Sequence, residues 1–108
     1  MPQIIIKGLN EEQCAELSVK SAPELARICN CPSDWFTFDL VRSRFYDKNG
    51  KIAPYPVVQV WWFERPMEIQ DKVAKFLHKQ FENMGFHCDQ ISFHIFENER
   101  YYENGDKC

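Results

Sequence analysis

The sequence predicts an α+β domain in which two β-α-β repeats form a four-stranded mixed sheet with two helices on one face. Strand-like runs of period two alternate with helix-like runs of period 3.6 in the order β-α-β-β-α-β. The second half repeats the first, because Asp34 and Asp89 open corresponding strands. Right-handed crossovers then place both helices on the same side of the sheet. We expect one domain over residues 1–108, with repeat one at about 2–46, repeat two at about 56–97 and a C-terminal tail at 98–108.

The first repeat carries a local signal for each of its first elements. Residues 3–7 are a short β-rich run. Asn10, with Gln13 three residues later, forms a capping-box pattern at the start of a helix. The apolar periodicity of that helix continues to about residue 29. Pro23 lies inside it, where the missing backbone donor predicts a kink or a short break.

The remaining elements follow from patterning and turn residues. Residues 34–45 alternate between apolar and polar, which predicts a strand with one apolar face, and Asn49-Gly50 predicts a hairpin-type turn. Residues 57–63 are apolar almost throughout, as in a strand that is covered on both faces. A strongly amphipathic helix is expected over 66–84, and 90–97 alternate again as the last strand of the sheet.

Composition and charge argue against several classes of protein. The net charge is −3 and no basic stripe is present, so we expect no nucleic-acid partner. No apolar run has the length of a signal-peptide core or a membrane span, so we expect no membrane and a cytoplasmic location. The five cysteines are odd in number and irregularly spaced. This favours free cytosolic thiols over a disulfide framework, and we expect no metal site.

One face of the predicted sheet needs a cover. It is the face turned away from the helices, and it carries one side of the tryptophan-rich third strand together with Thr37, Asp39, Ser92 and His94. A monomer would leave these side chains in water. Oligomerisation through this face is the economical arrangement.

The two ends of the chain distinguish between the two folds that share this order of elements, the ferredoxin-like and the tautomerase-like fold. The opening Met1-Pro2-Gln3-Ile4-Ile5-Ile6 resembles that of the tautomerase superfamily, in which proline follows the initiator methionine. The wider likeness includes Trp62-Phe63-Glu64-Arg65, Ile69-Gln70-Asp71-Lys72-Val73 and Asn98-Glu99-Arg100-Tyr101-Tyr102-Glu103-Asn104-Gly105. Over essentially its whole length the chain resembles a bacterial family of unknown function in that superfamily, beside macrophage migration inhibitory factor and oxalocrotonate tautomerase.

The resemblance implies a tautomerase-like fold and a homotrimer closed through the sheet face. It also implies a cation near the start of the second strand that holds the substrate's carboxylate, but residues 31–37 contain no Lys or Arg. Near the last strand, Ser92 and His94 stand where the inhibitory-factor branch has a tyrosine and an asparagine. The carboxylate-binding pattern of the superfamily is therefore not carried over intact.

Pro2 is the candidate catalytic residue. Its secondary amine, placed in an apolar pocket, would act as a general base because desolvation lowers the pKa of an amine towards neutrality. The alternative role is structural, since a proline at the start of an edge strand loses no ladder hydrogen bond. A retained Met1 turns the prolyl nitrogen into an amide, which has no basicity.

The predicted topology brings the starts of the first two strands and the ends of the last two to the same end of the sheet as Pro2. The candidate substrate-binding residues at this end are Cys31, Phe63, Arg65, Arg100 and Tyr101. Either arginine would bind a carboxylate bidentately, or would pair with a nearby glutamate instead. Cys31 is either a nucleophile or an inert thiol. Tyr101 either lines the pocket or reaches a neighbouring subunit.

Two hypotheses for the function, from different classes, are favoured. The first is a cofactor-independent keto–enol tautomerase of a small 2-oxo acid, in which Pro2 moves the proton and Arg65 or Arg100 holds the carboxylate. The second is a catalytically silent trimeric module that binds small molecules or partners, which the missing cation near Cys31 supports. A ferredoxin-like small-molecule sensor ranks third.

Overall fold

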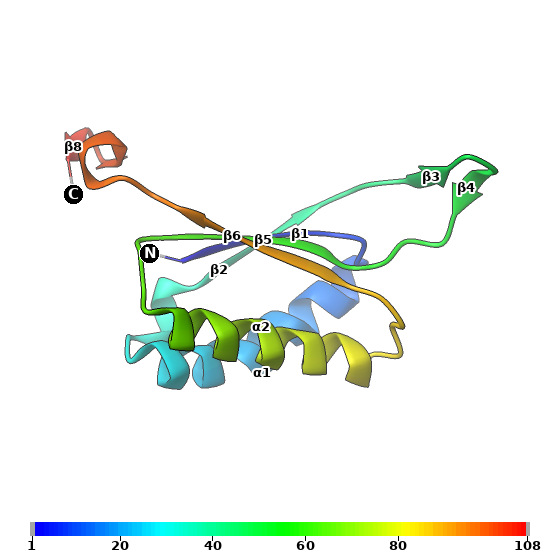
Figure 1. Ribbon diagram of the computed structural model, residues 1–108, viewed down its shortest axis with the longest axis horizontal. Coiled ribbons are helices and arrows are strands. Elements are labelled where there is room, and N and C mark those ends of the chain that lie inside the picture. The colour runs from blue at the N-terminus through cyan, green and yellow to red at the C-terminus, as the bar shows by residue number, and fades with distance from the viewer. Residues whose placement is uncertain (1, 108) are drawn as a thin grey trace.

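A single four-stranded sheet with the strand order β2-β1-β5-β6 organises the computed structural model, which describes residues 2–107 (Figure 1). Its strands are β1 (Gln3–Lys7), β2 (Thr37–Val41), β5 (Val57–Trp62) and β6 (Gln90–Ile95). β1 pairs in parallel with β2 and antiparallel with β5, and β5 pairs in parallel with β6. The mixed sheet that the repeat pattern predicts is therefore confirmed.

Two helices, α1 (Glu11–Cys29) and α2 (Met67–Asn83), lie side by side on one face of the sheet (Figure 1). The core lies between the two layers, because Ile4, Val60 and Trp62 of the sheet and Leu25 and Phe81 of the helices are fully buried. Neither helix is long and apolar enough to cross a membrane. The start of α1 is fixed as the sequence predicts. The Asn10 side chain accepts from Gln13 N at 2.8 Å, and the Gln13 side chain accepts from Asn10 N at 2.9 Å.

Pro23 does not interrupt α1, so of the two alternatives that the sequence left open, a kink or a short break, the short break is wrong. The helix runs continuously from Glu11 to Cys29 with Pro23 inside it. Proline lacks the N–H that would bond the carbonyl of residue 19, and Val19 is 76% exposed. Pro23 and Val19 both lie on the solvent side, so the carbonyl group that loses this donor is on the side that faces water.

The two repeats share a detail at their first residue. Pro2 precedes β1, and its carbonyl oxygen accepts a hydrogen bond from Thr37 N at 3.2 Å. Pro56 precedes β5, and its carbonyl oxygen accepts from Gln90 N at 3.0 Å. Both prolines are less than 2% exposed. The internal repeat thus extends to a buried proline that opens the first strand of each unit.

Two hairpins extend from opposite ends of the sheet and make the molecule 46 Å long (Figure 1). The first is β3 (Phe45–Asp47) with β4 (Gly50–Ile52); the hairpin is the expected one, but its turn residues are Lys48 and Asn49, and Gly50 already pairs with Asp47. The second is β7 (Tyr102–Glu103) with β8 (Asp106–Lys107). The strand expected over 34–45 is shorter in the structure: a 3₁₀ turn, η1 (Ser33–Trp35), precedes β2, and the chain leaves the sheet after Val41.

The second face of the sheet is open in the single chain. Thr37 and Asp39 pair in register with Gln3 and Ile5, on the side opposite the buried Ile4 and Ile6. Further along the sheet, Ser92 Oγ and His94 Nε2 are 2.8 Å apart, and His94 stacks on Trp61 with ring centroids separated by 4.5 Å. The structure therefore places Thr37, Asp39, Ser92 and His94 on the open face, as the strand alternation predicts.

Candidate functional site

Pro2 lies at the end of the sheet that topology predicts, on the side covered by the helices. Gln3 pairs with Thr37 on one side and with Trp61 on the other, so Pro2 is flanked by Phe36 and Trp62. The side chain of Pro2 is less than 2% exposed. A general base needs an apolar pocket around Pro2, but in the single chain this residue is part of the buried layer. An approach to its nitrogen therefore requires removal or movement of what covers it.

Arg65 is the candidate residue that reaches the same layer. It follows β5, and its Nη1 donates to the carbonyl oxygen of Cys29 at 3.2 Å, in the last turn of α1. Its guanidinium carbon lies 5.4 Å from the centroid of the Trp62 ring, within the range of a cation–π contact. The helix C-terminus supplies partial negative charge to this cation. Arg65 is thus held between the end of α1 and the end of β5.

Two buried donors near Pro2 have no hydrogen-bond acceptor among the described residues. They are Nε of Arg65 and Nε1 of Trp62. The ion pair of Arg65 with a glutamate, which the sequence left open as the alternative, is not formed among residues 2–107. Buried donors are rarely left unpaired, and an arginine presents a planar fork that matches a carboxylate. An anion is the ligand type that these donors can bind.

Arg100 has a different environment from Arg65. It ends a 3₁₀ turn, η2 (Asn98–Arg100), beyond β6, and its side chain is 79% exposed. Its Nε donates to Glu97 Oε2 at 2.8 Å. For Arg100 the glutamate pair is therefore the observed arrangement. The structure separates the two arginines that the sequence treated as equivalent candidates.

Cys31 lies just after α1, next to the residues that hold Arg65. Its backbone N–H donates to Ala26 O at 3.0 Å across Asn30, which is left-handed at φ 54°. The Cys31 side chain is half-buried against the core. Burial raises the pKa of the neighbouring Cys29 thiol, and the charge of Arg65 opposes that rise. Cys29 is thereby kept as a protonated, buried thiol.

Phe63 and Tyr101 belong to a separate aromatic cluster. Their ring centroids are 5.1 Å apart, and Tyr101 also packs on Phe96 at 4.6 Å. Phe96 in turn packs on Trp61 of the open face at 5.7 Å. The predicted site residues thus fall into two groups: Pro2, Cys31 and Arg65 lie on the helix side, and Phe63 and Tyr101 lie on the open side. A ligand that contacts both groups would have to lie at the end of the sheet.

The sequence did not indicate that Trp62 and the Cys29 carbonyl hold Arg65. Trp62 itself packs in the core, at 1% exposure. The signal in the sequence was an arginine shortly after β5. The free carbonyl groups at the C-terminus of a helix attract cations, and the C-terminus of α1 lies at the end of β5. Only the sheet order shows that these two ends meet.

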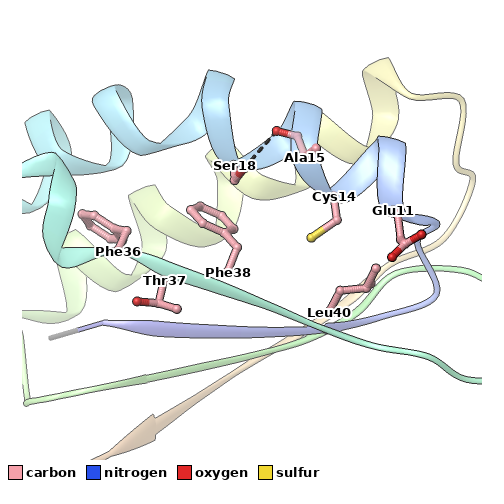
Figure 2. A pocket seen from close by; sticks show the side chains of 8 residues that line it. All are labelled: Glu11, Cys14, Ala15, Ser18, Phe36, Thr37, Phe38 and Leu40. Atoms are coloured by element: carbon pink, nitrogen blue, oxygen red, sulfur yellow. Dashed lines mark hydrogen bonds between the residues drawn. The ribbon is translucent and has the colours of Figure 1, made fainter.

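A groove of 550 Å³ between α1 and the edge strand β2 contains none of the candidate residues (Figure 2). Phe36, Phe38 and Leu40 form one wall, and Cys14 and Ser18 of α1 form part of the other. Ser18 Oγ donates to Ala15 O at 2.9 Å, so this hydroxyl is already bonded within the helix. Burial, with a smaller contribution from Asp39, raises the pKa of the Cys14 thiol. The groove therefore offers no cation and no activated thiol.

No cluster of three or more His, Cys, Asp or Glu side chains that could hold a metal ion is present in the part of the chain that the structure describes. The cysteines of that part are free thiols.

Comparison with known proteins identifies the family of this chain. A family model described as "Domain of unknown function (DUF1904)" matches residues 1–107. The chain belongs to the DUF1904 family. A crystal structure of a DUF1904 domain from Sebaldella termitidis ATCC 33386 shares 30% identity and a TM-score of 0.94 with it, over 100% of both chains. No curated protein matches.

More distant structures show the fold of this DUF1904 protein. A macrophage migration inhibitory factor-like protein from Entamoeba histolytica superposes with a TM-score of 0.79 at 13% identity, over 99% of this chain and 98% of its own. Pt0534, solved after inactivation by 2-oxo-3-pentynoate, superposes with a TM-score of 0.78 at 16% identity, over 98% and 94%. The protein has the tautomerase-like fold, as its sequence resemblance implies.

Proposed function

We propose that this DUF1904 protein is a cofactor-independent tautomerase of small 2-oxo acids whose general base is the Pro2 amine, freed by removal of Met1. The observation that carries the proposal is Arg65. It lies at the Pro2 end of the sheet, with a buried Nε that has no acceptor among the described residues. A carboxylate on the substrate would supply that acceptor, and the carbonyl next to it would then lie towards Pro2.

The chemistry needs only these two groups. An uncharged prolyl amine removes a proton from the carbon next to the carbonyl, which leaves an enolate, and the prolinium then donates that proton to the enolate oxygen to give the enol. The guanidinium fixes the carboxylate, which orients the acidic C–H bond. Desolvation by Phe36 and Trp62, which flank Pro2, would lower the pKa of the amine, so that more of it is uncharged at neutral pH. Pt0534, a structural neighbour, is inactivated by 2-oxo-3-pentynoate, and this supports a 2-oxo acid as the class of substrate.

A matched pair of arginine variants tests the proposal. In protein that lacks Met1, Arg65→Gln should lower kcat/KM for phenylpyruvate about 10- to 100-fold, the range of a charged hydrogen bond. Arg100→Gln should stay within about twofold, because Arg100 is exposed and bonded to Glu97. The methyl ester of phenylpyruvate should show no difference between Arg65→Gln and wild type. Equal losses on acid and ester would assign Arg65 a purely structural role and contradict carboxylate binding.

The second candidate function is a silent binding module, and the pair of prolines favours it. Pro56 opens β5 in the same way as Pro2 opens β1, with the same burial and the same carbonyl hydrogen bond. Pro56 has an acylated nitrogen and so has only a structural role. If Pro2 does no more than this, the chain binds a carboxylate at Arg65 without turning it over. If protein lacking Met1 binds phenylpyruvate but does not tautomerise it, this second function is the correct one.

We also propose a homotrimer closed through the open sheet face, as in the superfamily that the sequence resembles. Trp61, His94 and Ile5 are only half-buried there in the single chain, and a partner would cover them. Light scattering should give about three times the chain mass of 12.9 kDa. Trp61→Glu should shift the mass towards one chain, whereas Val19→Glu, on the exposed side of α1, should leave it unchanged. A wild-type mass of one chain would end this proposal.

A further inference from the structure

Trp62 has a buried N–H group that the rest of the described chain does not use. Its Nε1 has no hydrogen-bond acceptor among residues 2–107, although the residue is only 1% exposed. This atom of tryptophan can only donate, and a buried indole N–H usually has a partner. The neighbouring Trp61 shows the ordinary arrangement, because its Nε1 donates to Gln59 Oε1 at 3.1 Å. The N–H of Trp62 is therefore a donor that a ligand can use.

The ring that carries this N–H lies at the candidate site. Gln3 pairs in register with Trp61, so Trp62 is next to Pro2 across the two strands. The Trp62 ring packs on Phe93, with centroids 5.2 Å apart, and the guanidinium carbon of Arg65 lies 5.4 Å from its centroid. These contacts fix the ring and therefore the direction of its N–H. Because Arg65 is half-buried and Trp62 is fully buried, a ligand that reaches Arg65 from solvent is next to the indole.

Arg65 and Trp62 together offer more donors than a carboxylate needs. Nη1 of Arg65 is bonded to the carbonyl oxygen of Cys29, which leaves Nε and Nη2, the edge of the guanidinium that binds a carboxylate bidentately. A carboxylate on this edge has a donor for each of its two oxygens. The N–H of Trp62 is then left for a different oxygen of the same ligand. In a 2-oxo acid the nearest such acceptor is the oxo oxygen, on the carbon that carries the carboxylate.

We infer that Trp62 Nε1 donates to the oxo oxygen of the ligand, so that the site selects 2-oxo acids over acids without an oxo group. The inference rests on the proposed function, but only on its carboxylate site at Arg65 and not on catalysis by Pro2. A buried donor left unpaired costs binding free energy, so an acid that lacks the acceptor binds less tightly. During tautomerisation the same oxygen gains negative charge as the enolate forms, and a fixed N–H donor stabilises that charge.

Indole ¹⁵N NMR tests the inference without any change to the core. The chain has three tryptophans, Trp35, Trp61 and Trp62, and therefore three indole N–H signals. The probes are 2-oxobutanoate and butanoate, which differ only in the oxo group and have no aromatic ring that would shift the signals. 2-Oxobutanoate should move the Trp62 signal downfield and slow its exchange with water, and butanoate should move it much less. The Trp61 signal should stay in place with both. A Trp62 signal that responds equally to both acids, or to neither, overturns the inference.

Replacement of the indole N–H by sulfur measures what the hydrogen bond contributes. 3-Benzothienylalanine at position 62 keeps the two fused rings and removes the donor. The same residue at position 61 is the matched control, because the N–H of Trp61 is bonded within the chain. The change at position 62 should weaken binding of 2-oxobutanoate about 3- to 10-fold, the range of one neutral hydrogen bond, and should not weaken binding of butanoate. The change at position 61 should alter neither, and Arg65→Gln should weaken both. Equal losses for the two acids at position 62 would assign Trp62 to packing alone and overturn the inference.

The outcomes separate this inference from the proposed catalysis. Binding is measured in protein lacking Met1 and needs no turnover. If that protein prefers 2-oxobutanoate but does not tautomerise it, Trp62 is supported as a donor and only the role of Pro2 is contradicted. If the two acids bind equally tightly, the role of Trp62 is overturned and the carboxylate site at Arg65 stays in place. If neither acid binds, both the inference and the carboxylate site are wrong.

Discussion

Protein that has lost Met1 should tautomerise phenylpyruvate, and protein that retains it should be inactive. In the retained form the nitrogen of Pro2 is an amide, whose lone pair is delocalised into the peptide bond. In the processed form the nitrogen is an amine, and general base catalysis of this kind contributes about 10²- to 10⁴-fold in rate. The two forms are distinguished by intact mass and compared at equal concentration.

Two proline variants complete this comparison. Pro2→Ala without Met1 should keep part of the rate, because a free alanine amine is still a base. Pro56→Ala alters the equivalent proline of the second repeat, which is buried in the same way, and should keep the full rate per folded molecule. The rate of the processed enzyme should rise with pH through the pKa of the amine, because only the uncharged form accepts a proton. Equal activity with and without Met1 would exclude the prolyl amine as the base.

Gly8→Ala should destabilise the fold far more than Gly85→Ala, although the two glycines have the same backbone conformation. Both have φ near +94°, which disfavours any residue with a β-carbon. At Gly85 nothing lies within 4 Å of an added β-carbon. At Gly8 that carbon would overlap the carbonyl oxygen of Tyr55 and lie 3.2 Å from Pro56 N. Gly85→Ala thus measures the conformational cost alone, and Gly8→Ala adds a clash with backbone.

The expected size follows from this difference. Gly85→Ala should lower the free energy of unfolding by about 1–2 kcal/mol, the cost of a left-handed residue with a β-carbon. Gly8→Ala should lower it by at least about 4 kcal/mol, because the segment before β5 has to move. Urea denaturation at constant m-value measures both. Similar losses in the two variants would show that the connection from β1 to α1 moves away from Tyr55 at little cost.

Local patterning was sufficient to predict most of the fold. The apolar run of β1, the capping box of α1 and the amphipathic pattern of α2 each depend on neighbouring residues, and the structure has all three. The strand predicted over 34–45 is longer than the observed β2, because the chain leaves the sheet after Val41 and continues into β3. No local signal marks that point, since its polar residues also fit the alternation of a strand.

The candidate site was less predictable, for a physical reason. Strand order was enough to bring Pro2, Arg65 and Arg100 to one end of the sheet. Which arginine is held in the buried layer depends on its contact with the last turn of α1, and that contact joins residues 36 positions apart. The burial of Pro2 was also not predicted. It depends on how closely the two helices cover the end of the sheet.

The repeated strand-opening proline sets a limit on the number of reactive centres. In the proposed mechanism, removal of Met1 frees the nitrogen of Pro2, whereas the nitrogen of Pro56 could be freed only by cleavage within the chain. A ring of three subunits would contain six geometrically similar positions, of which three can acquire a titratable nitrogen. In the proposed trimer, the duplication would therefore leave three prolines without a free nitrogen, and these would show what the same proline does when its role is only structural.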